Sequence, residues 1–219
     1  NTTAFNLSNS VANTLTWRIT KGGCSANSQL IINNYRFTID ADVTSVDNHM
    51  YTCADTIILA GEQPGTGTGL WNLFNGGGMV INPTLYNSKI TNLAANDSYL
   101  EWIVTRNGCE ARDTVIVTNN KVTSNAGIAI TVCQDTVVLN AGTPVAPAFG
   151  TWTTLIGPAV DQANNPQSIV HNLLPNVNRF IWTITKGICT AKDTMDVINN
   201  APSKAIVEAD KEACSLSTT

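Results

Sequence analysis

The sequence predicts an all-β protein built from tandem antiparallel β-sandwich repeats of about 80 residues, arranged head to tail. The first observation is a repeat of cysteines: Cys53 and Cys133 are separated by the same interval as Cys109 and Cys189, which is the length of one repeat. The second is a series of short runs in which apolar and polar residues alternate, as in strands with one buried face. The third is composition, because only 13% of residues are charged while Thr, Val, Ile, Asn and Gly are abundant.

The repeat also sets the domain boundaries. Each late cysteine follows a tryptophan by seven residues, in the pairs Trp17–Cys24, Trp102–Cys109 and Trp182–Cys189. We therefore expect two complete copies, over residues 35–120 and 121–200. Residues 1–34 are expected to form the C-terminal part of a preceding copy, and residues 201–219 the start of a following one. An Asn-Asn pair closes each successive copy, at 33–34, 119–120 and 199–200.

The strand before each late cysteine is the clearest prediction within a copy. Leu100, Trp102 and Val104 share one face of it, so this face is expected to be buried. The matching faces carry Phe180, Trp182 and Ile184 in the next copy and Leu15, Trp17 and Ile19 in the N-terminal part. A Gly-containing turn, the cysteine and a second alternating run follow, which together predict a hairpin.

Further strands are expected before this hairpin in each copy. They cover residues 55–59 and 135–139, followed by segments that carry Trp71 and Trp152 behind a Gly-rich loop. Short runs add strands at 89–91 and 168–170. About seven strands per copy indicate a sandwich of immunoglobulin type, with the tryptophans in its core.

The six cysteines predict disulfides and an oxidising compartment. Zinc is the competing interpretation, but no two cysteines lie close enough in the sequence to form a Cys-x-x-Cys pair, and the two histidines, His49 and His171, do not repeat. One pairing scheme joins Cys53 to Cys109 and Cys133 to Cys189 within a copy. The other joins Cys53 to Cys189 between copies, and the topology leans towards it because the cysteines of one copy lie at opposite ends of the sandwich. In both schemes Cys24 and Cys214 have their partners outside this chain.

No pattern of catalytic residues stands out, so we expect a protein that is not an enzyme and needs no cofactor. The sequence has no Ser/His/Asp order, Gly-rich phosphate loop or HExxH motif. Asp40, Asp42 and Asp47 are weak candidates for calcium at a repeat junction. The matching stretch 121–131 has no acidic residue, so an ordinary solvated strand is the preferred interpretation.

Three segments resemble the Ig-like and PKD-like repeats of giant Bacteroidetes cell-surface proteins. They are Thr-Val-Cys-Gln-Asp-Thr-Val-Val-Leu at 131–139, Gly-Thr-Trp at 150–152 and Trp-Thr-Ile-Thr-Lys-Gly-Ile-Cys-Thr-Ala-Lys-Asp-Thr at 182–194. Such repeats occur in SprB-type gliding-motility adhesins and other substrates of the type IX secretion system. The resemblance implies a secreted, outer-membrane-associated filament for surface attachment or gliding. The alternative is an accessory module array, or a glycan-binding module, of a secreted carbohydrate-active enzyme; the glycan-binding module requires exposed Trp71 and Trp152.

A second resemblance concerns O-glycosylation, which in these bacteria modifies Asp-Ser/Thr-apolar triplets. The triplets here place candidate sites at Thr56, Thr114, Thr136 and Thr194. All four occupy equivalent places in the two copies. The alternative is that Asp-Thr only begins a strand.

The net charge and the hydropathy of the sequence limit the classes of partner that we expect. A net charge of −4 without a basic patch gives no reason to expect nucleic acid or an anionic membrane. No apolar run approaches the ~18 residues of a membrane span, and no signal peptide precedes the first strand-like run, so an excerpt of a longer mature protein is expected. The expected partners are neighbouring repeats of the same polypeptide, and surface polysaccharide or other glycans.

Overall fold

The computed structural model describes residues 3–8 and 12–202, and these residues form strands and turns without a helix. The chain divides into two compact units, residues 1–121 and 122–219. This division lies one residue from the expected boundary between positions 120 and 121. Most of the expected start of a following copy, including Cys214, lies outside the described residues.

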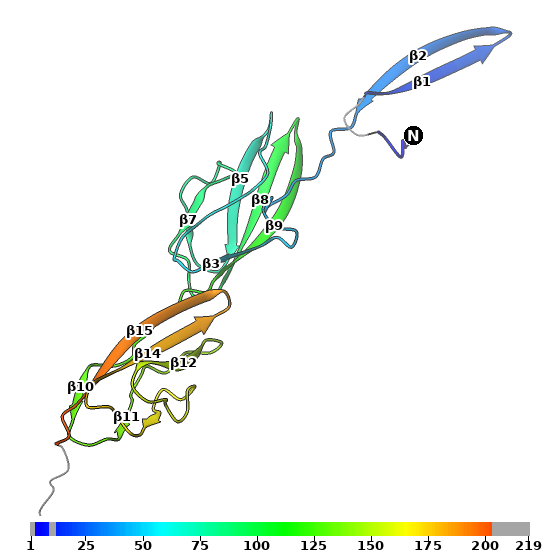
Figure 1. The fold of residues 1–219 in the computed structure, drawn as a ribbon. Coiled ribbons are helices and arrows are strands. Elements are labelled where there is room, and N and C mark those ends of the chain that lie inside the picture. Colours follow the sequence, from blue (N-terminus) through cyan, green and yellow to red (C-terminus); the bar gives the residue numbers. More distant parts are fainter. Residues whose placement is uncertain (1–2, 9–11, 203–219) are drawn as a thin grey trace, which may run out of the picture. The chain divides into compact units, whose positions relative to one another are not determined.

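The first unit begins with a two-stranded hairpin and continues with a seven-stranded sandwich. In the hairpin, β1 (Ala12–Lys21) and β2 (Cys24–Asn33) pair antiparallel around the turn Gly22-Gly23. One sheet of the sandwich has the order β3-β9-β8-β5 and the other β4-β7-β6 (Figure 1). The strands are β3 (His49–Thr52), β4 (Ile57–Ile58), β5 (Thr68–Asn75), β6 (Met79–Val80), β7 (Lys89–Thr91), β8 (Asp97–Arg106) and β9 (Cys109–Asn119).

The second unit repeats this arrangement. Its larger sheet has the order β10-β15-β14-β12, and β11 pairs with β13 in the smaller one (Figure 1). An isolated bridge between Val160 and Val170 stands where the first unit has β6. The strands are β10 (Ile130–Val132), β11 (Val137–Val138), β12 (Phe149–Ile156), β13 (Ile169–Val170), β14 (Asn176–Lys186) and β15 (Cys189–Asn199). The fold is therefore a tandem of immunoglobulin-like β-sandwiches, as predicted.

Two details differ from the expected strands. The strands at 55–59 and 135–139 are only two residues long, at β4 and β11. The strand before each early cysteine runs parallel to its neighbour, β3 to β9 and β10 to β15, while the other pairs are antiparallel. Backbone pairing decides both details, and side-chain alternation carries little information about it.

The predicted core is confirmed in both sandwiches. Along β8, buried and partly exposed residues alternate, and Leu100, Trp102 and Val104 are fully buried. The ring of Trp71 on β5 lies 4.8 Å from that of Trp102, centroid to centroid. The indole N–H of Trp102 donates to the carbonyl of Glu62 at 2.9 Å, so the ring is buried without losing its hydrogen bond.

The second unit has the same tryptophan pair. Trp152 and Trp182 lie 5.0 Å apart, and the Trp182 indole N–H donates to the carbonyl of Gly142 at 3.1 Å. Gly150 stands two residues before Trp152, and a Cβ atom there would lie 2.1 Å from the Trp182 ring. Gly69 has the same relation to Trp102, also at 2.1 Å. A residue with a side chain at either position would displace the central ring.

The N-terminal hairpin departs from the expected burial. Its face with Leu15, Trp17 and Ile19 was expected to be buried, but these side chains are 41%, 68% and 59% exposed. The alternation itself is correct, because the three residues share a face of β1. What differs is that no described residue covers this face as β5 covers β8.

We predict that Gly150→Ala destabilises the second sandwich by about 1–3 kcal/mol, because the added methyl group overpacks the Trp182 ring. Gly142→Ala is the matched control, since a Cβ there meets Asn125 at an ordinary 3.5 Å. Hydrogen exchange of β12 and β14 would measure the effect, with β5 and β8 as the internal reference. Equal protection in the two variants would contradict the proposed role of Gly150.

Candidate functional site

The features that recur in both units are cysteines, buried amides and the aspartates of the Asp-Thr pairs, so the candidate site is structural. Within the described residues, no group of three His, Cys, Asp or Glu side chains is placed to hold a metal. No helix of the described residues is both long and apolar enough to cross a membrane.

The two cysteines of each copy lie at opposite ends of one strand. Thr52 pairs with Asn119 at the end of β9, which places Cys53 just beyond that end, whereas Cys109 begins β9. Ten residue steps of strand separate the two ends by roughly 33 Å. A disulfide requires about 4.4–6.8 Å between Cα atoms. The register of Val132 with Asn199 gives Cys133 and Cys189 the same separation in the second unit.

The bonding state of the cysteines follows this geometry. Cys53 and Cys189 are disulfide-bonded. Cys109, which is partly buried, and the exposed Cys24 and Cys133 carry free thiols. The pairing of Cys53 with Cys109 and of Cys133 with Cys189 is therefore wrong, and so is the expectation that Cys109 and Cys133 are bonded within this chain. The reason is the length of the strand between the two cysteines of a copy.

A buried asparagine lies at the end of each sandwich. In the sequence, the Asn-Asn pairs indicated only a domain boundary at these positions. The Asn119 side-chain amide donates to the carbonyl of Leu93 at 3.2 Å, and its oxygen accepts from the backbone N–H of Lys121 at 2.9 Å. In the second unit Asn199 makes the same two bonds, to Leu173 at 3.2 Å and from Ala201 at 2.9 Å. We call this arrangement the asparagine clamp.

The N-terminal hairpin ends in the same clamp. Asn34 donates its side-chain amide to the carbonyl of Leu7 at 3.0 Å and accepts from the N–H of Arg36 at 3.2 Å. The clamp thus occurs three times, ten residues after Cys24, Cys109 and Cys189. The amide is buried at Asn119 and Asn199 and partly buried at Asn34. Because it satisfies two backbone groups, it fixes the path by which the chain leaves the sheet.

The aspartate of the late Asp-Thr pair holds the start of each copy. The Asp113 carboxylate accepts from the backbone N–H of Ala41 at 3.0 Å and from the Asn48 side chain at 2.6 Å. In the second unit Asp193 accepts from the N–H of Ala126 at 2.8 Å. These aspartates therefore have a structural role that the glycosylation triplet does not explain.

The four candidate glycosylation threonines differ in access. Thr114 and Thr194 are exposed, on β9 and β15. Thr56 and Thr136 are partly buried before β4 and β11, and the Thr136 hydroxyl donates to Asp135 at 3.2 Å. Solvent exposure therefore favours Thr114 and Thr194 as glycosylation sites over Thr56 and Thr136.

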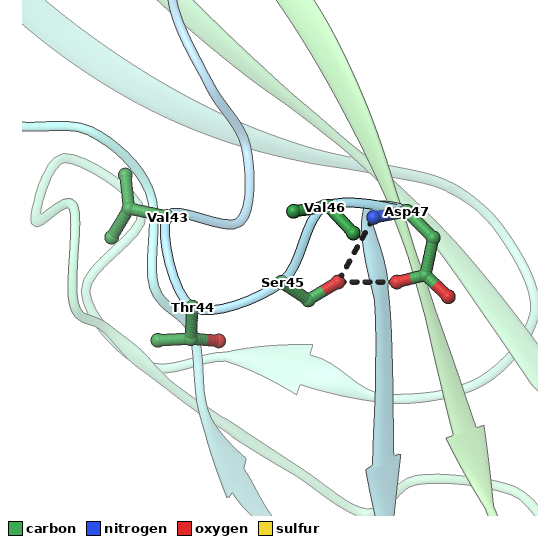
Figure 2. Close-up of a pocket in the computed structure, with 5 residues that line it drawn as sticks. All are labelled: Val43, Thr44, Ser45, Val46 and Asp47. Atoms are coloured by element: carbon green, nitrogen blue, oxygen red, sulfur yellow. Dashed lines mark hydrogen bonds between the residues drawn. The ribbon is translucent and has the colours of Figure 1, made fainter.

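The three calcium candidates act as local hydrogen-bond acceptors. The side chain of Asp40 accepts from the N–H of Asp42, whose own Oδ1 accepts from the N–H of Thr44, both at 2.9 Å. Asp42 is fully buried, and its Oδ2 has no hydrogen-bond partner. The Asp47 carboxylate accepts from the Ser45 hydroxyl beside a shallow surface hollow (Figure 2), and this bond lowers its pKa. The three carboxylates do not form a shared cluster.

The tryptophan and histidine candidates are also accounted for by packing. Trp71 and Trp152 are 3% and 2% exposed, so the exposed stacking platform that a glycan-binding module requires is absent at these residues. His49 stacks on Tyr51 with ring centroids 4.3 Å apart, and its Nε2 lies 2.7 Å from the Thr118 hydroxyl. His171 lies 3.3 Å from the exposed carboxylate of Asp161.

One ion pair ties the hairpin of the second sandwich. Arg179 on β14 binds Asp196 on β15 through two hydrogen bonds, of 2.7 Å and 2.8 Å. Hydrogen bonding to the guanidinium lowers the pKa of Asp196 below its ordinary value. The equivalent positions of the first unit hold Tyr99 and Ile116, so the pair is not a feature of the repeat.

Comparisons with known proteins give structural similarity only. No protein-family model and no curated protein matches the sequence. Drosophila OTK extracellular domains 3–5 are 11% identical with a TM-score of 0.48, over 87% of this chain and 72% of that one. The insect immune protein hemolin is 9% identical with a TM-score of 0.45, over 85% and 56%. The four N-terminal Ig domains of Dscam1 are 12% identical with a TM-score of 0.36, over 81% and 51%. We assign the fold from its own strand order and register.

We predict that Asn199→Ala destabilises the second sandwich by about 1–3 kcal/mol, because the Leu173 carbonyl loses its buried donor. Asn200→Ala is the matched control: its side chain is exposed, and its backbone N–H bond to Val132 remains. Urea unfolding of both variants would measure the difference. A urea midpoint for Asn199→Ala equal to that of the control would show that the clamp does not stabilise the sandwich.

Proposed function

We propose that this chain is a structural segment of a long, secreted, filamentous cell-surface adhesin, of the kind used for attachment or gliding. The observation that supports the proposal is the asparagine clamp, because the chain leaves the hairpin and both sandwiches by way of the same pair of bonds. Repeated sandwiches suit a spacer that bears load.

The strand order of each sandwich suits pulling from its two ends. The first strand, β3 or β10, runs parallel to the last, β9 or β15. Tension pulls the beginning of the first strand and the end of the last strand in opposite directions. The bonds between the two strands are then loaded together in shear, and they resist better than bonds opened one after another.

The disulfide would add a covalent route for tension. In our proposal Cys53 pairs with Cys189, the late cysteine of the next copy. This pairing joins positions that are further apart in the sequence than the length of one repeat, so successive staples of this kind overlap. The free Cys109 and Cys133 then pair with matching cysteines of the copies before and after, and Cys24 and Cys214 have their partners outside this chain as well.

We predict that force spectroscopy of the chain, pulled from its ends, finds a fully unfolded length shorter by about 480 Å without reductant than with it. The staple would hold the segment between Cys53 and Cys189 out of the extended path. Cys189→Ser should give the long form without reductant, and Cys109→Ser, which removes a free thiol, should leave the short form unchanged. Full extension of the non-reduced parent chain would disprove the staple.

The main alternative remains an accessory module array of a secreted carbohydrate-active enzyme. The flanking sequence of the parent polypeptide separates the two proposals. Many further copies of the repeat favour the adhesin, whereas an adjoining catalytic domain with paired carboxylates favours the enzyme. Surface labelling of intact cells with a membrane-impermeant reagent would test the proposed location.

We also propose O-glycosylation at Thr114 and Thr194, the two exposed candidate threonines. The intact mass of the native protein should exceed the sequence mass by one glycan per occupied site, and Thr194→Ala should remove one increment. Thr153→Ala is the control, because Thr153 is an exposed strand threonine without a preceding aspartate. A native mass equal to that of the bare sequence would exclude the modification at all four candidates.

A further inference from the structure

The face of the N-terminal hairpin that carries Leu15, Trp17, Ile19 and Leu30 is the largest unexplained feature of the described residues. Leu30 is 59% exposed, as is Ile19, and Trp17 is 68% exposed. Leu15, Trp17 and Leu30 border a hollow of about 450 Å³ on this face. The equivalent residues of β8, Leu100, Trp102 and Val104, are fully buried.

The hairpin makes two local contacts that recur in the second sandwich. Asn13 accepts from the N–H of Ser8 at 2.9 Å and donates to the carbonyl of Ser8 at 3.1 Å. At the equivalent position of the second unit, Asn178 makes the same pair of bonds with Leu174, at 2.9 Å and 2.8 Å. The Asn34 clamp lies at the same end of the hairpin, because Ala12 pairs with Asn33, so this end is held as the corresponding end of β14 and β15 is.

In each of the two sandwiches, a strand that carries a tryptophan covers the equivalent face. The outer edge of β8 pairs antiparallel with β5, which places Trp71 opposite Trp102. The outer edge of β14 pairs with β12, which places Trp152 opposite Trp182. In both cases a glycine two residues before the incoming tryptophan makes room for the ring of the hairpin. The outer edge of β1, on the side away from β2, pairs with no strand among the described residues.

We propose that the hairpin face is the docking surface for the early half of a repeat, with a Gly-x-Trp strand that adds antiparallel to β1. Its tryptophan would lie opposite Trp17, and its glycine would leave space for the Trp17 ring. The interaction is a β-augmentation in which backbone bonds give affinity and the tryptophan pocket gives specificity. It rests on the proposed tandem organisation, because it takes the hairpin as the late half of a copy.

The chemistry of the face favours this occupant over others. In each complete unit, the loop carbonyl that accepts the central indole N–H lies forty residues before that tryptophan, at Glu62 or Gly142. An early half-repeat therefore brings the glycine, the tryptophan and the carbonyl acceptor on one segment. A second hairpin of the same kind would bring Trp17 without the glycine or the acceptor.

Trp17 makes the proposal easy to test, because the other four tryptophans are at most 3% exposed. Acrylamide quenching of the intact chain therefore reports mainly on Trp17. The probe is a synthetic peptide of residues 122–174 with Cys133→Ser and with non-fluorescent 4-fluorotryptophan at position 152, which makes it inert to disulfide exchange and silent in tryptophan fluorescence while the indole ring is kept. We predict that saturating peptide lowers the quenching of the chain to the level of its buried tryptophans.

The control peptide carries Gly150→Val in addition, and it should protect Trp17 at least tenfold less well, because its side chain occupies the space of the ring. In the chain, Trp17→Ala should lose binding of a dye-labelled peptide, whereas Val46→Ala, at an exposed apolar residue outside the hairpin, should keep it. Equal protection by both peptides, undiminished binding to Trp17→Ala, or no protection would overturn the proposal.

Protection of Trp17 that grows with chain concentration and needs no peptide would also overturn it, because a second copy would then be the occupant. Sedimentation of the chain alone identifies that outcome. Failure of the docking proposal would leave the proposed tandem organisation untouched, because force spectroscopy and the flanking sequence test that organisation without the peptide.

Discussion

The contact on which each sandwich depends is the pair of indole rings that meet across neighbouring strands. The ring of Trp102 occupies the space beside Gly69, and its N–H holds the carbonyl of Glu62. One side chain thereby fixes the register of β5 with β8 and the path of the loop that leads into β5. The second unit repeats the arrangement, which explains why a Gly-x-Trp sequence returns with each complete copy.

The sequence specified this core well because its signals are local. Alternation identified the buried faces of β8 and β14, and the glycine turns identified the hairpins. The two-residue strands β4 and β11 and the parallel pairing of β3 were beyond such reasoning, because backbone hydrogen bonds to distant segments define them. Alternation also showed that Trp17 belongs to a face meant for burial, but it contains no information on whether a partner is present.

The candidate site was visible in part. The cysteine spacing raised two pairing schemes, and only the strand register separated them, because it places Cys53 and Cys109 at opposite ends of β9. In the sequence, the Asn-Asn pairs indicated only where each copy ends. The structural role of Asn119 depends on the carbonyl of Leu93, 26 residues earlier, which the sequence pattern does not reveal. Asp113 and Asp193 were noted for their threonine neighbours, whereas their contacts run to the start of the copy, 65 to 72 residues away.

Two classes of contact hold each sandwich, and they differ in range. The asparagine clamp and its neighbouring bonds join residues within 27 positions of each other, so the late half of a copy organises itself. The indole bond spans 40 positions, and the aspartate bonds span more, so they join the early half to the late half. The N-terminal hairpin has bonds of the first class at Asn13 and Asn34, and no described residue covers its Trp17 as Trp71 covers Trp102. In the docking that we propose, bonds of the second class form when an early half adds to β1, and its Gly-x-Trp strand then covers the apolar face.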